Sequence, residues 1–418
     1  MPPDCIRGYV MRSIIVIGGG AAGLMAAGTA AKNGNSVTII EKNDILGKKM
    51  LITGKGRCNI TNACEDTEEL IKNMTKNGSF MYSAFYGFNN LQTIEFFNEI
   101  GVETKVERGN RVFPVSDKSK TVVDALVKWA KSQGVRIIYD TVLNLVSDGN
   151  LVKGVNCKNK GEILCDCVIL ATGGVSYPRT GSTGDGYKWV MELGHKVNTP
   201  IASLVPLDTV EEWSYSLAGL SLKNIEITVT NEKNKKVYTD FGEMMFTHTG
   251  ITGPVVLSAS AHLRPMEYGK YRVKIDLKPA LSEKQLDERI QRDFAKNLNK
   301  NLDNSLDELL PKNLIVPIIN LAEIDGKKKV NSITKEERQK LGYAIKNIIL
   351  TVSDFAPIEQ AIITSGGVEV NEIDPGTMES KLVKNLYFAG EIIDVDAYTG
   401  GFNLQIAFST GYAAGMSV

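Results

Sequence analysis

The sequence predicts an α/β protein in which a parallel-sheet domain, built from both ends of the chain, is interrupted by an inserted region. A short apolar strand, a glycine-rich turn, a helix and a second strand follow one another over residues 13–41. Two later apolar runs, at 165–174 and 385–394, each end in a glycine turn. Between these runs the pattern changes to alternating strands at 197–280 and to helices with charged faces at 282–350, as expected for an insertion.

The opening segment has the features of a dinucleotide-binding unit. The run SIIVIG fits a buried parallel strand, and it leads directly into Gly18-x-Gly20-x-x-Gly23. Gly18 permits the tight turn, Gly20 lets the backbone approach a pyrophosphate, and Gly23 lets the helix pack closely on the strand. The helix ends at Gly34, and the next strand ends in Glu41, at about the twenty-residue spacing from which a carboxylate binds a ribose.

The same stretch has a second interpretation as the apolar core of a secretory signal, because arginines and a methionine lie close to it. A signal needs a small-residue cleavage site followed by unrelated sequence, whereas here strand, turn, helix and acidic strand end continue in register. We therefore favour the dinucleotide unit and expect the residues before Met11 to form an unstructured extension.

The composition is that of an ordinary globular protein of more than one domain, with 418 residues of which 43% are hydrophobic. Lys+Arg and Asp+Glu both number 48, so no net field favours nucleic acid or an anionic membrane as a partner. The six cysteines are too scattered for a disulfide scaffold, which favours reduced thiols and a cytoplasmic location, and we expect no metal site. Outside the glycine-rich opening, no apolar run is long enough to span a membrane.

The opening unit alone leaves FAD and NAD open, because both present an ADP half. Two further segments favour FAD: CDCVILATGG at 165–174 is a strand followed by a glycine turn, and NLYFAGEIID at 385–394 is a strand ending in Gly-Glu. The tail at 398–415 has the pattern of a glycine turn that opens a helix aimed at the cofactor. This combination resembles the two-dinucleotide-binding-domain flavoproteins, which include glutathione reductase and fumarate reductase relatives.

A closer resemblance extends over essentially the whole chain from Ser13. Long and unusual motifs carry it: GKKMLITGKGRCNITN (47–62), RVFPVSDKSKTVVDAL (111–126), TGSTGDGYKW (180–189), FTHTGITGP (246–254) and AGEIIDVDAYTGGFNLQIAFSTG (389–411). Together they resemble the BaiN-like (YhiN-type) flavoprotein family. The resemblance implies bound FAD and three domains: a Rossmann-like FAD-binding domain (1–196 and 376–418), an inserted β-barrel-like domain (197–280 and 351–375) and a small helical domain (281–350).

The motifs give cofactor-binding roles to residues on several turns. The pyrophosphate and the adenosine ribose are expected at the first unit, with the pyrophosphate at Gly18, Gly20, Ala22 and Gly23 and the ribose at Glu41 and Lys42. The turn after the 165–170 strand is expected beside the ADP moiety, at Thr172 and Gly173. The C-terminal motif is expected to bracket the ribityl chain and the isoalloxazine ring, through Gly390, Glu391, Asp394, Asn403 and Leu404.

The family resemblance adds further cofactor contacts. It implies that Gly47, Lys48 and Lys49 continue along the phosphate and ribityl side. It also implies that Thr53 and Gly54 lie nearer the ring and that the backbone of Val142 meets the adenine.

Cys58 and Cys64 raise the question of a redox-active dithiol, because disulfide reductases carry one shortly after the second strand. Those enzymes have C-x4-C, whereas GRCNITNAC has C-x5-C, a spacing that aligns the sulfurs less well along a helix of about 3.6 residues per turn. A role for Cys58 in lining the flavin site is therefore favoured over dithiol catalysis.

Four other side chains are candidates for catalysis. Arg57 could stabilise an anionic reduced flavin as a fixed cation, with a salt-bridged or surface arginine as the alternative. His248 could move a proton, since its unperturbed pKa lies near neutrality. Tyr177 and Tyr398, in glycine-bordered loops, could donate a proton or stack on a ligand, although such tyrosines more often pack in the core.

The family resemblance implies two chemistries: NAD(P)H-linked reduction of a conjugated carbonyl, as in bile-acid enones, and oxidation of small amines with peroxide formation. We favour the reductase and a small-molecule substrate, with the amine oxidase as the runner-up and a flavin-dependent disulfide reductase as a remote alternative. No second GxGxxG unit follows a strand, so NAD(P)H is expected to bind only transiently. The sequence leaves the oligomeric state open.

Overall fold

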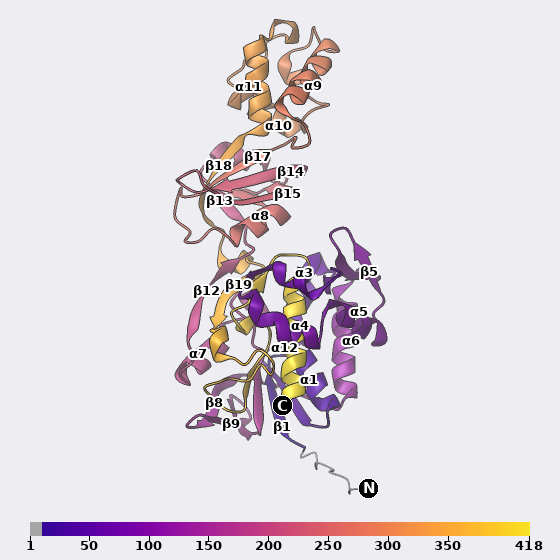
Figure 1. Cartoon of the computed structure of the whole chain (residues 1–418), viewed down its shortest axis with the longest axis vertical. Coiled ribbons are helices and arrows are strands. Elements are labelled where there is room, and N and C mark those ends of the chain that lie inside the picture. The colour runs from indigo at the N-terminus through magenta and orange to yellow at the C-terminus, as the bar shows by residue number, and fades with distance from the viewer. Residues whose placement is uncertain (1–10) are drawn as a thin grey trace. The chain divides into compact units, whose positions relative to one another are not determined.

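The computed structural model describes residues 11–418; Cys5 and the extension expected before Met11 lie outside the described part. The described chain forms two compact units (Figure 1). The sheet unit contains the residues up to Ala202 and Ala361–Val418, and the barrel unit contains Ser203–Gln360. Each unit has its own hydrophobic core.

A five-stranded parallel sheet forms the centre of the sheet unit, in the order β20-β11-β1-β2-β7. Its strands are β1 (Ser13–Ile17), β2 (Ser36–Glu41), β7 (Arg136–Tyr139), β11 (Cys167–Leu170) and β20 (Leu386–Phe388). β1 lies in the middle, with Ile14 opposite Val37 on one side and Cys167 on the other. The predicted α/β fold class and the strand assignments of the opening unit are confirmed.

The strand order reverses direction between β1 and β11. From β1 the chain first builds the sheet outward through β2, and it later returns to add β11 on the other side of β1. In open α/β sheets, ligands bind in the crevice outside the carboxyl ends of the strands at such a switch point.

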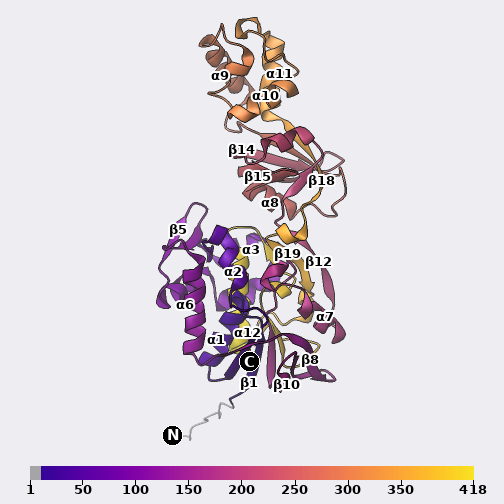
Figure 2. The same ribbon diagram turned by 180° about the vertical axis from the view of Figure 1, so that it is seen from behind.

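Helix α1 (Ala21–Lys32) is enclosed by its neighbours, and every residue in it except Lys32 is buried. It packs between α6 (Ser119–Ser132) and α12 (Phe402–Ser417) (Figures 1 and 2). Side chains at Gly411 and Gly415, one helical turn apart, would each lie 2.5 Å from a carbonyl oxygen of α1. These glycines let α12 approach α1 closely, which fixes the amino end of α1 beside the switch point.

The remaining helices and strands of the sheet unit form smaller layers around this centre. The small sheets are β8 (Val142–Asp148) with β9 (Leu151–Cys157) and β10 (Gly161–Leu164); β3 (Thr61–Asn62) with β6 (Arg111–Pro114) and β5 (Thr104–Glu107); β4 (Met74–Lys76) with β21 (Asp396–Ala397); and β12 (Val197–Ser203) with β19 (Ile363–Val368). The other helices are α2 (Lys48–Ile52), α3 (Thr67–Lys72), α4 (Tyr82–Gly87), α5 (Asn90–Glu99) and α7 (Asp185–Glu192).

The barrel unit contains a closed antiparallel barrel of six strands, which confirms the predicted barrel-like insert; one α-helix lies in the chain between β16 and β17, and three α-helices lie between β17 and β18. The strands are β13 (Leu207–Thr209), β14 (Ser221–Thr230), β15 (Lys236–Phe246), β16 (Gly250–Thr252), β17 (Arg272–Asp276) and β18 (Ile348–Phe355). The helices are α8 (Pro254–Ser260), α9 (Glu283–Ala295), α10 (Lys312–Leu321) and α11 (Lys335–Lys346).

The expected three-domain boundaries stay a prediction. The barrel and the helical segment share one hydrophobic core, because side chains of α9, α10 and α11 join those of the barrel strands. β12 and β19 pair with each other outside the barrel strands, although both lie in ranges that the sequence assigned to the barrel-like domain.

Candidate functional site

Four loops at one edge of the central sheet form the candidate site. Parallel strands bring their carboxyl ends to the same edge, where β1, β2, β11 and β20 lead into residues 18–23, 42–49, 171–177 and 389–391. The first and third loops touch, since a side chain at Gly18 would lie 2.5 Å from the carbonyl oxygen of Ala171. The sheet therefore gathers most of the predicted cofactor residues at the switch point.

The glycine turn before α1 is shaped for a bound diphosphate. Gly20 is the N-cap of α1, and no side chain caps the helix there. A Cβ at Gly20 would meet no atom within 4 Å, whereas one at Gly23 would lie 1.9 Å from the carbonyl oxygen of Gly18. The first amides of an α-helix have no partner inside the helix and carry the positive end of its dipole. The open backbone at Gly20, followed by Ala22 in the first turn, therefore fits the pyrophosphate of FAD.

Glu41, at the end of β2, is buried and holds the turn in place. Its Oε2 accepts a hydrogen bond from the N–H of Gly19 (2.7 Å), and its Oε1 accepts bonds from the N–H (2.8 Å) and side-chain amide (2.6 Å) of Asn43. A carboxylate offers roughly four acceptor positions, so one remains for a ribose hydroxyl. Glu41 thus has the geometry that its predicted role requires.

Lys49 and Glu391 form an ion pair that joins two of the loops. The Nζ of Lys49 donates to Oε2 of Glu391 (2.6 Å) and to the hydroxyl of Ser176 (2.7 Å). Oε1 of Glu391 accepts from the hydroxyl of Ser176 (2.9 Å) and the N–H of Thr364 (2.8 Å). Burial raises the pKa of Glu391, but the Lys49 cation and these hydrogen bonds outweigh it and lower the pKa below its ordinary value. The Lys49 charge is therefore balanced within the protein rather than held ready for a phosphate.

Two other predicted cofactor residues, Lys42 and Asp394, also form ion pairs within the protein. Lys42 binds Asp185 (2.7 Å) and Thr183 at the start of α7. Asp394 is fully buried: its carboxylate pairs with Lys76 (2.7 Å) and accepts from Asn198 (2.7 Å). A buried carboxylate is stable only with such partners, and the predicted place of Asp394 beside the flavin stays a prediction.

The other predicted cofactor residues have simpler surroundings. Gly47, Gly54, Gly173 and Gly390 all have a positive φ that favours glycine. The hydroxyl of Thr53 donates to the carbonyl of Met50, and Lys48 lies 3.7 Å from Asp44.

The remaining four predicted contacts lie in different parts of the sheet unit. Thr172 packs against α7, because a Cβ at Gly186 would lie 2.3 Å from its hydroxyl. The side-chain amide of Asn403 holds the backbone of Ala397 and Tyr398, while Leu404 is half-buried on α12 and the side chain of Val142 is buried at the start of β8.

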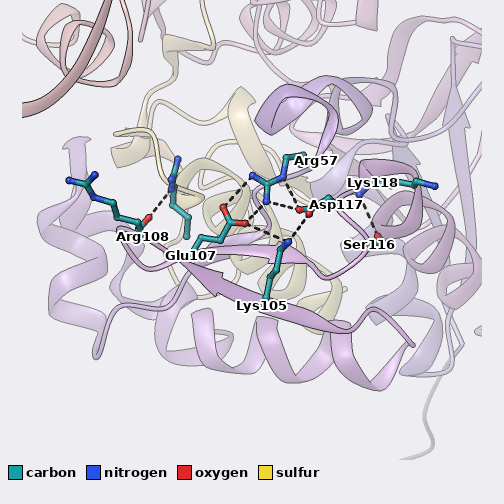
Figure 3. A network of polar contacts seen from close by, with 8 residues as sticks. Arg57, Lys105, Glu107, Arg108, Ser116, Asp117 and Lys118 are labelled. Atoms are coloured by element: carbon teal, nitrogen blue, oxygen red, sulfur yellow. Dashed lines mark hydrogen bonds and ion pairs between the residues drawn. The ribbon is translucent and has the colours of Figure 1, made fainter. Parts of the chain in front are cut away.

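Arg57 lies in a charge network rather than alone (Figure 3). Its guanidinium forms two hydrogen bonds with the carboxylate of Glu107 and donates from Nε to Asp117 (2.8 Å), which also binds Lys105 (2.6 Å). It also stacks on the ring of Phe113, 4.1 Å from the ring centroid. The observed contacts therefore agree with the alternative of a salt-bridged arginine. The charge of Arg57 is paired with carboxylates and is not a free cation for the flavin.

Cys58 does not have the properties of a catalytic thiol. Its side chain is fully buried, and burial raises its pKa to about 12. Cys64 is also buried, with its pKa raised to about 11 by burial, and both cysteines are free thiols. The thiolate is the reactive form, so burial and the raised pKa disfavour a dithiol mechanism, and a role for Cys58 at the flavin site stays a prediction.

The predicted proton-transfer residues lie in different units. His248 is exposed in the turn between β15 and β16 of the barrel unit. Tyr177 and Tyr398 belong to the sheet unit, and both are half-buried. Tyr177 has a left-handed backbone (φ 51°), burial raises its pKa, and Lys49 Nζ lies 6.0 Å from its ring centroid. This strained conformation next to the Lys49–Glu391 pair singles out Tyr177 among the tyrosines at the edge of the sheet.

Sequence reasoning missed the residues that complete these clusters. Ser176 and Thr364 hold Glu391, and Lys76 neutralises Asp394. Ser176 follows the glycines of the 171–177 loop, and a polar residue at that place is the one local signal available. Lys76 and Thr364 lie far along the chain from their partners, so no spacing pattern indicates them.

Comparison with known proteins identifies the family. The model of the family described as "HI0933-like protein Rossmann domain" matches residues 12–417. The chain belongs to this family. The HI0933-like chain is 31% identical to the 3-dehydro-bile acid delta(4,6)-reductase of Clostridium scindens, over 97% of this chain and 98% of the relative. It is 32% identical to the ribosomal RNA dihydrouridine synthase of Haemophilus influenzae, again over 97% of this chain and 98% of the relative.

A solved structure supports the fold. The HI0933-like chain matches the 3-ketosteroid delta1-dehydrogenase of Sterolibacterium denitrificans with a TM-score of 0.50 and 13% identity, over 97% of this chain and 98% of that chain. At this identity the likeness concerns the fold alone.

The HI0933-like protein is a FAD-dependent oxidoreductase, as expected from its motifs. The open backbone at Gly20 and the buried carboxylate of Glu41 have the geometry expected of the predicted FAD site. Among residues 11–418, no helix combines the length and apolar character needed to cross a membrane.

Proposed function

We propose that this protein reduces a carbon–carbon double bond conjugated to a carbonyl group, with NAD(P)H as the electron source and a steroid enone as the substrate class. The observation that carries the proposal is the 31% identity, over nearly the whole of both chains, to a 3-dehydro-bile acid delta(4,6)-reductase. Bound FAD would supply hydride transfer between NAD(P)H and the substrate. In the net reaction, hydride adds to the β-carbon, a proton adds to the α-carbon, and NAD(P)⁺ is released.

The residues at the carboxyl edge of the sheet have defined tasks in this proposal. The backbone at Gly18, Gly20 and Gly23 holds the pyrophosphate, and Glu41 holds the ribose. The Lys49–Glu391 pair joins two loops at the same edge, so that both keep one position during the reaction.

A proton donor is needed for the α-carbon, and we assign it to Tyr177. Its pKa is raised by burial, so the phenol stays protonated at neutral pH, as an acid must. Its left-handed backbone fixes the direction of the side chain next to Lys49 and Glu391. Tyr398 and His248 are the alternatives from the sequence, and we place Tyr177 first because its ring lies beside Lys49 of the Lys49–Glu391 pair.

A second candidate is reduction of a uracil base in ribosomal RNA, favoured by the 32% identical relative named for that reaction. The uracil C5–C6 bond is also conjugated to a carbonyl, so the same proton and hydride steps apply. Equal numbers of acidic and basic residues do not provide the net positive charge that commonly accompanies RNA binding, which is why we place the steroid enone first.

Anaerobic stopped-flow absorbance of the flavin tests the proposal. NADH or NADPH is expected to bleach the flavin, and 4-androstene-3,17-dione is expected to restore its colour. Restoration only by a uracil-containing ribosomal RNA fragment would favour the second candidate. Bleaching only by an amine, with peroxide formed when oxygen is admitted, would contradict both and support an amine oxidase.

The proton donor is tested separately. Tyr177→Phe is expected to slow reoxidation by the steroid at least tenfold and to leave bleaching by NAD(P)H unchanged. Tyr139→Phe, at an exposed position at the end of β7, is the matched control. Equal slowing of both half-reactions in Tyr177→Phe would mean that the residue only supports the cofactor site.

A further inference from the structure

Thr364, near the start of β19, is buried in the sheet unit and holds the backbone of a loop at the candidate site. Its hydroxyl oxygen accepts hydrogen bonds from two consecutive amides, the N–H of Val175 (2.8 Å) and the N–H of Ser176 (3.0 Å). A hydroxyl oxygen has two acceptor lone pairs, so these two bonds use both of them. One side chain of β19 therefore fixes the last part of the 171–177 loop.

The same residue also contacts the 389–391 loop. The N–H of Thr364 donates to Oε1 of Glu391 (2.8 Å), the oxygen that also accepts from the hydroxyl of Ser176 (2.9 Å). This close approach requires glycine at position 174, because a Cβ there would lie 2.3 Å from the hydroxyl oxygen of Thr364 and 3.0 Å from Oε1 of Glu391. Thr364 thus joins the two loops to each other and to β19.

Tyr177 directly follows the two amides that Thr364 holds. Its backbone is left-handed (φ 51°), and its ring centroid lies 6.0 Å from Nζ of Lys49. Such a conformation costs free energy in a residue other than glycine and persists only where the surrounding structure imposes it. On the other side of Tyr177, its carbonyl accepts from the N–H (2.8 Å) and the hydroxyl (2.7 Å) of Thr180, which closes the local turn. The bonds to Thr364 attach this turn to the rest of the sheet unit.

The hydroxyl of Thr364 has no simple replacement. Ser176 is fully buried, so water cannot easily take the place of the acceptor for its N–H. A buried N–H that loses its acceptor costs more than the hydrogen bond itself contributes. If the hydroxyl is removed, the loop must therefore move until its amides reach another acceptor, and Tyr177 moves with it.

We propose that Thr364 is a positioning residue for Tyr177: by holding the amides of Val175 and Ser176, it sets the place from which the phenol protonates the substrate. The inference rests on the proposed function, because Thr364 acts through the proton donor of that reaction. Tyr177 gives its phenolic proton to the α-carbon and is reprotonated from water, while Thr364 keeps its own proton.

Hydrogen exchange of the FAD-loaded full chain, followed by mass spectrometry of peptides that contain Val175 and Ser176, tests the contact without any substrate. Thr364→Val keeps the shape of the side chain and removes the acceptor, so exchange of these amides should become about tenfold faster or more. Thr364→Ser keeps the acceptor and should protect them as in the wild type. Thr209→Val is the matched control and should leave the exchange unchanged, because the buried hydroxyl of Thr209 has no hydrogen-bond partner in the described part of the chain.

Reoxidation of the flavin by 4-androstene-3,17-dione measures the effect on proton transfer. Thr364→Val should slow reoxidation about tenfold and leave bleaching by NAD(P)H unchanged, and Thr364→Ser should come within about twofold of the wild-type rate. In Tyr177→Phe the proton donor is already absent, so adding Thr364→Val should cause little further slowing. Gly174→Ala is a second variant in case Thr364→Val does not fold: its Cβ displaces the Thr364 hydroxyl, so it should reproduce both effects.

The inference is overturned if Thr364→Val leaves the exchange of the two amides at the wild-type rate. It is also overturned if Thr364→Val slows reoxidation by the same factor in the wild type and in Tyr177→Phe, or slows both half-reactions equally, since Thr364 would then only support the fold. Absence of any reoxidation of the wild-type flavin by the steroid would refute the proposed function alone, because the exchange measurement tests the role of Thr364 without the substrate.

Discussion

Two turns of the sheet unit, residues 18–23 and 54–58, both contain glycines but differ in what their polar groups contact. At the first turn, the space around Gly20 is open and no side chain caps α1. At the second turn, Arg57 is bound by Glu107 and Asp117, and Cys58 is buried. The first turn therefore presents backbone N–H donors to a ligand. In the second turn, the charge of Arg57 is paired with carboxylates of the protein.

This difference shows why a basic residue in a glycine-rich turn is weak evidence for an anion site. A guanidinium offers five donors in a fixed fork, and two carboxylates on a neighbouring hairpin can occupy most of them. Backbone amides at a helix start have no such alternative within the helix. If this difference holds, a ligand can reach the first turn, while the groups of the second turn are occupied by the protein.

The largest expected effect concerns Cys58 in the second turn. With a pKa of about 12, its thiolate at pH 8 is about a thousandfold scarcer than that of a thiol at 9.0. Alkylation of Cys58 by iodoacetamide, followed by mass spectrometry, should be slower by at least that factor in the folded protein than in urea. Rapid labelling of the folded protein would mean that the second turn is open as well.

The next effect concerns the first turn. Gly20→Val places a side chain where the structure has open space and where the diphosphate is expected, so the Kd for FAD should rise about 100-fold while the apoprotein unfolds as before. Gly87→Val, at a glycine that also has no neighbouring atom within 4 Å, is the control and should bind FAD normally. Calorimetric titration of the apoprotein measures both.

A smaller effect is expected for Arg57→Gln. If Arg57 faced the flavin, removing its charge would lower the two-electron potential by about 30 mV or more, equivalent to a tenfold change. The observed network predicts a smaller change in the flavin potential. Glu107→Gln and Arg57→Gln should both lower the free energy of unfolding. A large drop in potential in Arg57→Gln, with an opposite shift in Glu107→Gln, would instead favour the flavin-cation role.

The smallest expected effect is a pH dependence of the network. A hydrogen bond from Arg57 lowers the pKa of Glu107, and hydrogen bonds from Lys105 and Arg57 lower that of Asp117. These carboxylates bind protons more weakly in the folded state, so their contribution is present above their ordinary values of 4.5 and 3.8 and is lost as the pH falls below them. Urea unfolding of wild type and Arg57→Gln should therefore differ at pH 7 and converge only when the pH falls well below 3.8. A difference that persists in acid would assign the effect to packing on Phe113.

The parts of the molecule that sequence reasoning predicted are the ones determined by neighbouring residues. The path from β1 through the glycine turn and α1 to Glu41 depends on local spacing, and the structure reproduces it. The contacts that sequence reasoning missed join distant segments: Lys49 and Glu391 are 342 residues apart, and Arg57 and Glu107 are 50 apart. Asp394 illustrates the same limit, because its position suggested a cofactor contact while its burial beside Lys76 is decided by the fold.

A crystal structure of the protein with FAD bound tests the central claim most directly, namely that the turn at residues 18–23 holds the diphosphate. The account predicts diphosphate oxygens within about 3 Å of the backbone nitrogens at the start of α1, and a ribose hydroxyl at the carboxylate of Glu41. A diphosphate bound elsewhere, with side chains or solvent in contact with those nitrogens, would contradict it.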